Sequence, residues 1–324
     1  MRQIKITLLA MVLVAVVAAC NFSGNKKKEV VGPQPFPYLP TATMGDPEAN
    51  IINETEHFWN RFFDTTRVYS KDSLLVKGVT VKSISDAFTQ YAMRLQIIPL
   101  KNVLKAQSNL MALVEADQKR NPESNIYKNF LEINADFLFD VQSQFRSEDA
   151  YIPVLESAIR NCADSVQKET YLYDLSVCSM NRIGAIANDF TYATNKGKKG
   201  TLHKISSEYT IILFSNPGCN ACEQIIRYMS DPQMKIIFAQ TKTTVLNIYP
   251  DEDLAEWYEY MPIYPEEWIN GYNPNAEIKI EKKFSLRAIP SLYLLDKEKK
   301  VIYKDAEIEM IMRYLAGKSS QSIR

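Results

Sequence analysis

A Cys-x-x-Cys motif at a predicted strand-to-helix junction constrains the fold of this 324-residue chain more than any other feature. The apolar run at residues 209–214 predicts a buried strand, and the Asn-Pro-Gly sequence at 216–218 ends it. The residues after Cys222 favour a helix. The sulfur of Cys219 would therefore lie at a helix N-terminus, where unpaired amides and the helix dipole stabilise a thiolate. Because Cys222 follows three residues later on the same helical face, the two sulfurs can close a disulfide. We interpret the pair as a redox-active dithiol.

The N-terminus has the three parts of an export signal. Arg2 and Lys5 precede an apolar run at residues 6–19, which is short for a membrane-spanning helix. The small residues directly before Cys20 resemble a bacterial lipobox. The resemblance implies cleavage before Cys20 and lipid attachment to its sulfur and new amino group. An ordinary signal peptide over residues 1–20, with an incidental cysteine, is the alternative. We expect a lipid-anchored protein of the bacterial cell envelope that faces the periplasm.

Residues 21–50 have the composition of an extended tether. Five prolines lie between positions 33 and 47, with few apolar anchors among them. Such a segment is semi-rigid and rises about 3 Å per residue where it is polyproline-like. The three lysines at 26–28 either contact anionic lipid headgroups or belong to a solvated linker.

Charge and composition exclude several classes of partner and cofactor. The chain has 38 Lys and Arg residues against 38 Asp and Glu residues, and the basic ones are dispersed. This distribution argues against a nucleic-acid partner. Zinc is not expected, because there is one Cys-x-x-Cys and the two histidines, His57 and His203, are not in ligand spacing. No metal site and no cofactor are predicted.

Two cysteines remain after Cys20 and the redox pair are assigned. Cys162 and Cys178 can form a structural disulfide, since an exported chain meets an oxidising compartment. Alternatively, Cys178 is a small buried helix residue, as free cysteine often is. We favour the second interpretation.

The segment from residue 51 to 181 is predicted to be an all-α domain. Its apolar residues recur every three or four positions, and Gly78 is the only glycine between 46 and 184. Thr55 is a candidate cap for the first helix, and Ser83 or Ser85 for the second. The expected helices cover residues 57–63, 87–95, 103–117, 126–141, 151–162 and 165–180.

The segment from residue 182 to 318 mixes strands and helices, and residues 319–324 are expected to form a tail. A helix after Cys222 and another at 231–241 separate apolar, β-branched strands. The last helix, at 306–315, is expected to end at Gly317. This order predicts a central sheet with helices on both faces. The expected strands cover residues 187–192, 201–205, 209–214, 243–249, 291–295 and 301–303.

An aromatic-rich insertion lies between residues 249 and 290. Aromatic side chains supply rigid contact area, so the insertion can form one wall of a substrate groove. It can also pack a covering helix onto the sheet, which is the interpretation we favour. The aromatic residues are Trp257, Tyr258, Tyr260, Tyr264, Trp268 and Tyr272.

The strand, the Cys-x-x-Cys helix, the core strand, Ile289-Pro290 before a hairpin and the final helix resemble the thioredoxin fold. They are most similar to its membrane-attached thiol-disulfide oxidoreductases of the TlpA and ResA kind, over residues 181–318. The segment at 183–190 is similar to the opening segment of those proteins and of peroxiredoxins. The resemblance implies an α/β thioredoxin-like C-terminal domain preceded by an all-α domain. The all-α domain looks like a module found before such domains in bacterial lipoproteins, and this likeness implies no activity.

The resemblance also implies roles for individual residues. Cys219 would be the exposed nucleophile, and Cys222 would be the resolving thiol that breaks the mixed disulfide. Pro290 matches the family's cis-proline, and the backbone beside it, at Ile289, would pair with bound peptide. The implied partners are thiols and disulfides of exported proteins and a membrane or periplasmic redox donor.

Three features depart from the family pattern. Ala221 stands where a proline is common, and Leu213 and Ile225 stand at the two positions where the family has a buried acid. Glu223 is the nearest carboxylate. It can act as a base toward Cys222, or it can simply favour the helix dipole while opposing thiolate formation.

We therefore expect a membrane-tethered disulfide reductase or isomerase. A peroxidase fits poorly, because the peroxiredoxin motif has Thr or Ser three residues before its reactive cysteine, where Cys219 has Asn216. The alternative from a different class is a non-catalytic binding or assembly lipoprotein whose helical domain docks a partner.

Overall fold

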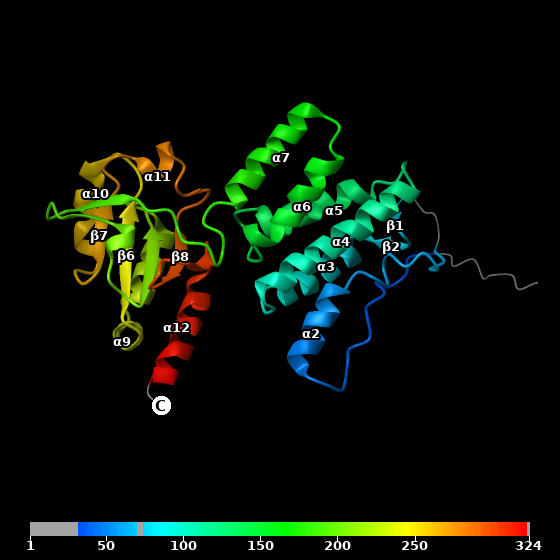
Figure 1. Ribbon diagram of the computed structural model, residues 1–324, viewed down its shortest axis with the longest axis horizontal. Helices are drawn as coiled ribbons and strands as arrows, with labels where there is room; N and C mark the ends of the chain where they lie inside the picture. The colour runs from blue at the N-terminus through cyan, green and yellow to red at the C-terminus, as the bar shows by residue number, and fades with distance from the viewer. Residues whose placement is uncertain (1–31, 70–73, 323–324) are drawn as a thin grey trace, which may run out of the picture.

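A computed structural model describes residues 32–69 and 74–322 of the chain. Figure 1 shows a helical half beside a half built on a β-sheet, joined by the segment that follows α7 (Ser165–Cys178). The expected signal peptide, Cys20 and the lysines at 26–28 lie outside the described residues. Within the described ranges, no helix is both long enough and apolar enough to span a membrane.

The N-terminal half is a group of helices packed around an aromatic core. Asp46 caps the first helix by accepting a hydrogen bond from the amide of Glu48, and Pro47 occupies the first turn, where it forfeits no helical hydrogen bond. Residues after α5 continue as a single π-helical turn, Ala135–Phe139. The other elements are α2 (Pro47–Glu56), β1 (Leu75–Val76), β2 (Val79–Thr80), α3 (Val81–Leu95), α4 (Leu100–Arg120), α5 (Ile126–Asn134) and α6 (Glu148–Asn161).

The predicted helix at residues 57–63 is instead a series of turns after α2, and α3 begins earlier than the predicted 87–95. Thr55 lies in the last turn of α2, where its hydroxyl donates to the Ile51 carbonyl, so it caps no helix. Thr80, not Ser83 or Ser85, caps α3 by accepting from the amide of Ser83. The all-α half also contains the short β1–β2 hairpin.

Part of the expected tether belongs to the helical core. The Phe36 side chain is 6% exposed, and its ring lies 5.9, 5.3 and 5.5 Å from the ring centroids of Phe58, Trp59 and Phe62. The amide of Gln34 donates to the Gly78 carbonyl at 2.7 Å. The folded part of the chain therefore begins well before residue 51.

Within the described residues, the C-terminal half contains a seven-stranded sheet in the order β4-β3-β7-β6-β5-β8-β9. Strand β5 pairs in parallel with β6 and antiparallel with β8, so it is an interior strand of the sheet. The strands are β3 (Thr191–Thr194), β4 (Lys199–Thr201), β5 (Tyr209–Phe214), β6 (Thr243–Tyr249), β7 (Ile269–Tyr272), β8 (Ser291–Asp296) and β9 (Val301–Lys304).

The two faces of the sheet are covered differently. Alternate residues of β5 separate two cores, because successive side chains of a strand point to opposite faces. Ile211 and Leu213 pack with the longer helices, whereas Ile212 and Phe214 pack with short helices and loops. The helices on the first face are α8 (Asn220–Met229), α9 (Pro232–Thr241), α10 (Leu254–Tyr260) and α12 (Ile308–Ser322); those on the second are η2 (Leu202–Lys204) and α11 (Glu277–Ile280).

Three predictions for this half need correction. The first strand of the first hairpin, β3, begins at Thr191, four residues after the start of the predicted strand at 187–192. The return strand, β4, ends at Thr201, where the predicted strand at 201–205 was expected to begin. The insertion contributes α10, the one-turn helix η3 (Met261–Ile263) and a strand, β7, which no periodicity in the sequence indicates. The last helix continues through Gly317, because Ser319 is buried and its hydroxyl donates to Gln240 of α9. The expected tail is therefore mostly helical.

Buried ion pairs join the two halves. Glu148, in the first turn of α6, accepts from Nε of Arg287 at 2.8 Å and pairs with Nζ of Lys304 at 2.7 Å. The guanidinium of Arg287 also donates to the Phe139 carbonyl at 2.6 Å. Nη2 of Arg146 lies 3.0 Å from Oδ1 of Asp305. Since the side chains of Glu148 and Lys304 are 3% and 4% exposed, separating the halves would require these charges to be hydrated again.

The variant Glu148→Gln tests this interface. It leaves Lys304 and Arg287 buried without their carboxylate, and breaking a buried ion pair costs about 3–5 kcal/mol. We expect the free energy of unfolding, measured by urea denaturation, to fall by that amount. Glu132→Gln is the matched control, because it removes an exposed pair with Lys128 and should change stability by less than about 0.5 kcal/mol. Equal changes in both variants would contradict the interface.

The variant Phe36→Ala tests whether the proline-rich segment is part of the folded core. Truncation of a buried phenylalanine costs about 3–5 kcal/mol, and urea denaturation measures the loss. Met44→Ala changes an exposed residue of the same segment and should be nearly neutral. A stability of Phe36→Ala equal to that of the unmodified protein would show that the segment is a free tether.

Candidate redox site

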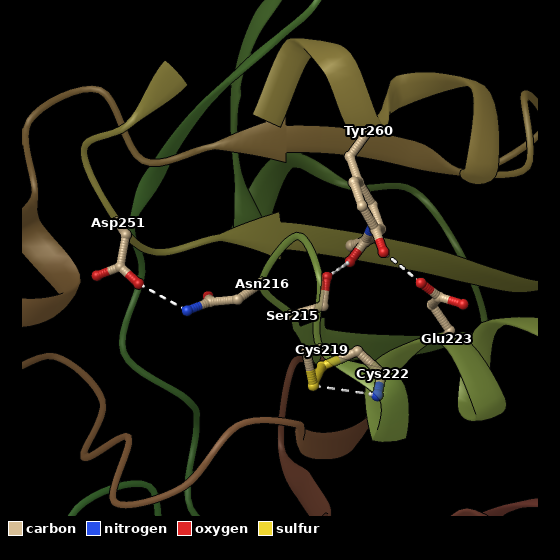
Figure 2. The surroundings of a disulfide bond; sticks show 8 residues. Ser215, Asn216, Cys219, Cys222, Glu223, Asp251 and Tyr260 are labelled. Carbon is tan, nitrogen blue, oxygen red and sulfur yellow. Dashed lines mark hydrogen bonds between the residues drawn. A yellow bond between two sulfur atoms is a disulfide. The ribbon is translucent and has the colours of Figure 1, made fainter. Parts of the chain in front are cut away.

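Cys219 and Cys222 lie where β5 ends and α8 begins, and their sulfurs are joined in a disulfide with a Cα–Cα distance of 5.2 Å. Figure 2 shows this pair at the start of the helix. The turn before it needs Gly218, whose φ of +69° is a backbone conformation that other residues rarely adopt. The predicted strand, turn and helix are therefore confirmed at this position.

The two cysteines differ in their access to solvent. Cys219 is half-buried and occupies the N-cap position of α8, where its sulfur accepts from the amide of Cys222 at 3.2 Å. Cys222 is 1% exposed. One sulfur can thus meet a second molecule, whereas the other can meet only its neighbour.

The Ile289–Pro290 peptide bond is cis, as expected. Strand β8 begins directly after Pro290, and its first residue, Ser291, pairs with Phe214, the last residue of β5. Because the turn to Cys219 starts just after Phe214, this register brings Pro290 to the same edge of the sheet as the disulfide. Ile289 is half-buried and packs against the core on the second face of the sheet.

Glu223, in the first turn of α8, is held by two donors. The hydroxyl of Tyr260 donates to its Oε1, and Nη2 of Arg227 donates to its Oε2 at 2.7 Å. The hydrogen bond from Tyr260, followed by that from Arg227, lowers the pKa of Glu223. The same bond to the carboxylate raises the pKa of Tyr260. Figure 2 shows Tyr260 extending from α10 toward this carboxylate, above the two cysteines.

The aromatic insertion divides between core and site. Trp257, Tyr264 and Trp268 are buried in the core on the first face of the sheet, which confirms the packing interpretation for these three. Tyr260, however, contacts Glu223 on the helix that carries the two cysteines. Sequence patterns missed this contact, because nothing in the spacing of the aromatics indicates which of them turns toward α8.

A row of uncharged polar side chains runs from the end of β5 across β6 to β7. The hydroxyl of Ser215 donates to Oδ1 of Asn247 at 2.5 Å, and Nδ2 of Asn247 donates to Oδ1 of Asn270 at 3.2 Å. Ser215 and Asn247 are both 1% exposed. Leu213, at the expected acid position, is an ordinary core residue. Asn247 within the apolar run at 243–249 is the signal by which sequence reasoning could have found this row.

A second polar contact fixes the turn itself. Nδ2 of Asn216 donates to Oδ2 of Asp251 at 2.8 Å, and Nζ of Lys279 pairs with Oδ1 of the same carboxylate. Figure 2 shows Asn216 and Asp251 on the side of the turn opposite Glu223.

Cys162 and Cys178 are free thiols. Cys178 is fully buried in α7, and burial raises its pKa to about 12. Cys162 is half-buried and donates to the Asp164 carbonyl. The alternative of a disulfide between Cys162 and Cys178 is therefore wrong.

Among residues 32–69 and 74–322, no group of three or more His, Cys, Asp or Glu side chains is placed to hold a metal ion.

Comparisons with known proteins show which solved structures this chain resembles. No protein-family model matches the chain, and no curated protein matches it. Among solved structures, a thioredoxin-like protein from Bacteroides caccae is 31% identical, with a TM-score of 0.71, over 87% of this chain and 98% of that chain.

Two shorter structures also match. The C-terminal domain of an uncharacterized protein from Bacteroides fragilis is 44% identical over 42% of this chain and 98% of that chain, with a TM-score of 0.41. The thioredoxin domain of a thiol-disulfide oxidoreductase from Bacteroides vulgatus is 17% identical over 43% of this chain and 98% of that chain, with a TM-score of 0.38. The match to the Bacteroides caccae structure extends over both halves of the chain, and this chain belongs to the thioredoxin-like proteins.

Proposed function

We propose that this protein is a membrane-tethered thiol-disulfide oxidoreductase that reduces or isomerises disulfides of exported proteins. The unequal exposure of Cys219 and Cys222 carries the proposal. A half-exposed sulfur at a helix N-terminus can react with a substrate sulfur, and a buried sulfur beside it can release the product. Lipid attachment at Cys20 would keep this reaction at the bacterial cell envelope, facing the periplasm.

In the reducing direction, the Cys219 thiolate attacks one sulfur of a substrate disulfide. The substrate S–S bond breaks, a mixed disulfide forms on Cys219, and the departing substrate sulfur takes up a proton. Cys222 then loses its proton and attacks the sulfur of Cys219. This step closes the Cys219–Cys222 disulfide and releases the second substrate thiol. Two electrons and two protons pass to the substrate, and a membrane or periplasmic dithiol must return them for another cycle.

We assign substrate binding to the backbone at Ile289 and Pro290. The pairing of Ser291 with Phe214 supports this assignment, because it puts the segment next to the turn that carries Cys219. An extended peptide that aligned there would present its sulfur to Cys219. Backbone groups that have no partner in the fold can pair with a bound extended peptide.

A second candidate function is a non-catalytic assembly protein whose helical half docks a partner. Helix α7 favours it, because three apolar side chains of this helix, Val166, Leu172 and Tyr173, are 77%, 40% and 58% exposed. These side chains would supply apolar contact area if a partner bound this helix.

A redox titration with a thiol label separates the two candidates. For an oxidoreductase, Cys219 and Cys222 gain label together in one two-electron transition, while Cys178 stays unlabelled in the folded protein. The double variant Cys219→Ser, Cys222→Ser should lose both this transition and function in the cell. Full cellular function of the double variant would instead favour the assembly protein.

The variant Cys222→Ser is expected to accumulate mixed disulfides, because the thiol that resolves them is absent. Non-reducing electrophoresis of cells that express it should show adducts that disappear on reduction, and mass spectrometry identifies their partners. Cys162→Ser is the matched control and should yield none. Adducts that persist when Cys219 is also replaced by serine would show that Cys219 is not the nucleophile.

A further inference from the structure

Glu223 is the charged group most closely tied to the two cysteines. Its amide donates to the Cys219 carbonyl at 3.0 Å, and it directly follows Cys222 in the first turn of α8. Residues one helical turn apart have Cβ atoms about 5–6 Å from each other. Glu223 is therefore a charged residue within one helical turn of Cys219, and its carboxylate is turned toward Tyr260 (Figure 2).

Tyr260 and Arg227 keep this carboxylate ionised and in one place. Each of its two oxygens accepts a hydrogen bond, one from the Tyr260 hydroxyl and one from the Arg227 guanidinium. Since these bonds favour the charged form, Glu223 does not take a proton from Cys222 at neutral pH. The hydrogen bonds therefore argue against Glu223 as a general base. Its effect on the two sulfurs is the electrostatic effect of a fixed negative charge.

Arg227 pairs with Glu223 and offsets part of its charge, but the Arg227 side chain is 75% exposed and is screened by water more strongly than the Glu223 side chain, which is 20% exposed. The Glu256 carboxylate lies 4.0 Å from where a Cβ on Gly218 would be, and Asp251 holds Asn216 on the other side of the turn. The cations of α8, α11 and the segment at 281–290 are already engaged. Their partners are Glu223 for Arg227, Asp251 for Lys279, Glu277 for Lys283, Glu148 for Arg287 and the ring of Tyr173 for Lys282.

We propose that Glu223, held by Tyr260, raises the cost of forming the Cys219 thiolate and so lowers the reduction potential of the Cys219–Cys222 couple. A thiolate at Cys219 would put a second negative charge near Glu223, and like charges disfavour each other. Because the thiolate exists only in the reduced state, this repulsion favours the disulfide and makes the dithiol a better electron donor. Glu223 acts through space, and Tyr260 is a positioning residue that acts through Glu223.

This inference rests on the proposed function and supplies what that proposal leaves open, the direction in which electrons prefer to move. Two electrons leave the sulfurs when the disulfide closes, as described above. The buried polar row of Ser215, Asn247 and Asn270 carries no charge and does not offset the effect.

The variant Glu223→Gln tests the inference with the full chain. The midpoint of the pH profile for alkylation of Cys219 by iodoacetamide should move down by about half a unit. In glutathione redox buffers at pH 8, where the thiolate is populated, the equilibrium should shift about threefold toward the dithiol. At 29.6 mV per tenfold change, the potential becomes about 14 mV less negative.

Two further variants test whether the shift is specific to the Glu223 carboxylate. Glu309→Gln removes the same charge from an exposed position on α12 and should change neither measurement. Tyr260→Phe should shift both in the direction of Glu223→Gln by a smaller amount, and it should add nothing when combined with Glu223→Gln, because the hydroxyl acts only through that carboxylate. Additive effects of the two substitutions would overturn the role of Tyr260.

The outcomes for the inference and for the proposed function are distinct. If the unmodified cysteines cycle together but Glu223→Gln behaves like Glu309→Gln, the inference is wrong and the oxidoreductase remains. If the cysteines do not cycle in the unmodified protein, the proposed function itself is wrong. Thermal unfolding of each variant shows whether a change in potential merely reflects a change in folding.

Discussion

The pairing of β5 with both of its neighbours is the interaction on which the candidate site depends. Strand β5 is buried along nearly its whole length, and its hydrogen bonds to β6 and β8 fix where each neighbour ends. A slip of one residue would exchange the two faces of the strand and expose its core side chains. Because the register is held so firmly, Pro290 and the turn to Cys219 meet at one edge of the sheet. The helix that follows then places one cysteine at the surface and the other beneath it.

The helical half is joined to the same edge by charge rather than by apolar contact alone. Arg287 lies three residues before Pro290 and is bound by Glu148 and the Phe139 carbonyl. Lys304, at the end of β9, binds Glu148 from the other side. Buried charges of this kind are costly unless each is paired, so the two halves are held in one arrangement. Helix α7 then lies beside the segment that leads to Pro290, where Lys282 contacts the Tyr173 ring.

The elements with strong local signals could be predicted, and those made by distant contacts could not. The apolar runs at 209–214 and 243–249 match β5 and β6 in full, because continuous burial leaves a continuous apolar sequence. Strand β7 escaped prediction, since Gly271 and Asn270 have little strand propensity and the strand forms by pairing with β6. Gly317 predicted a helix end, but packing of α12 against α9 outweighs the cost of one glycine. Phe36 sat in a proline-rich segment, where composition alone indicated a tether.

What the sequence determined by itself is the position of the cysteine pair: the spacing of Cys219 and Cys222 and their place at a strand-to-helix junction follow from local sequence patterns. What only the tertiary structure decided is the environment of that pair. Tyr260 meets Glu223 across 37 positions of sequence, and Ser215 meets Asn247 across 32. No local pattern encodes such contacts, because they depend on the order in which strands pair and on the path of the insertion over the sheet. The motif therefore identifies the sulfur atoms that we propose react, whereas the tertiary structure determines which charged groups surround them.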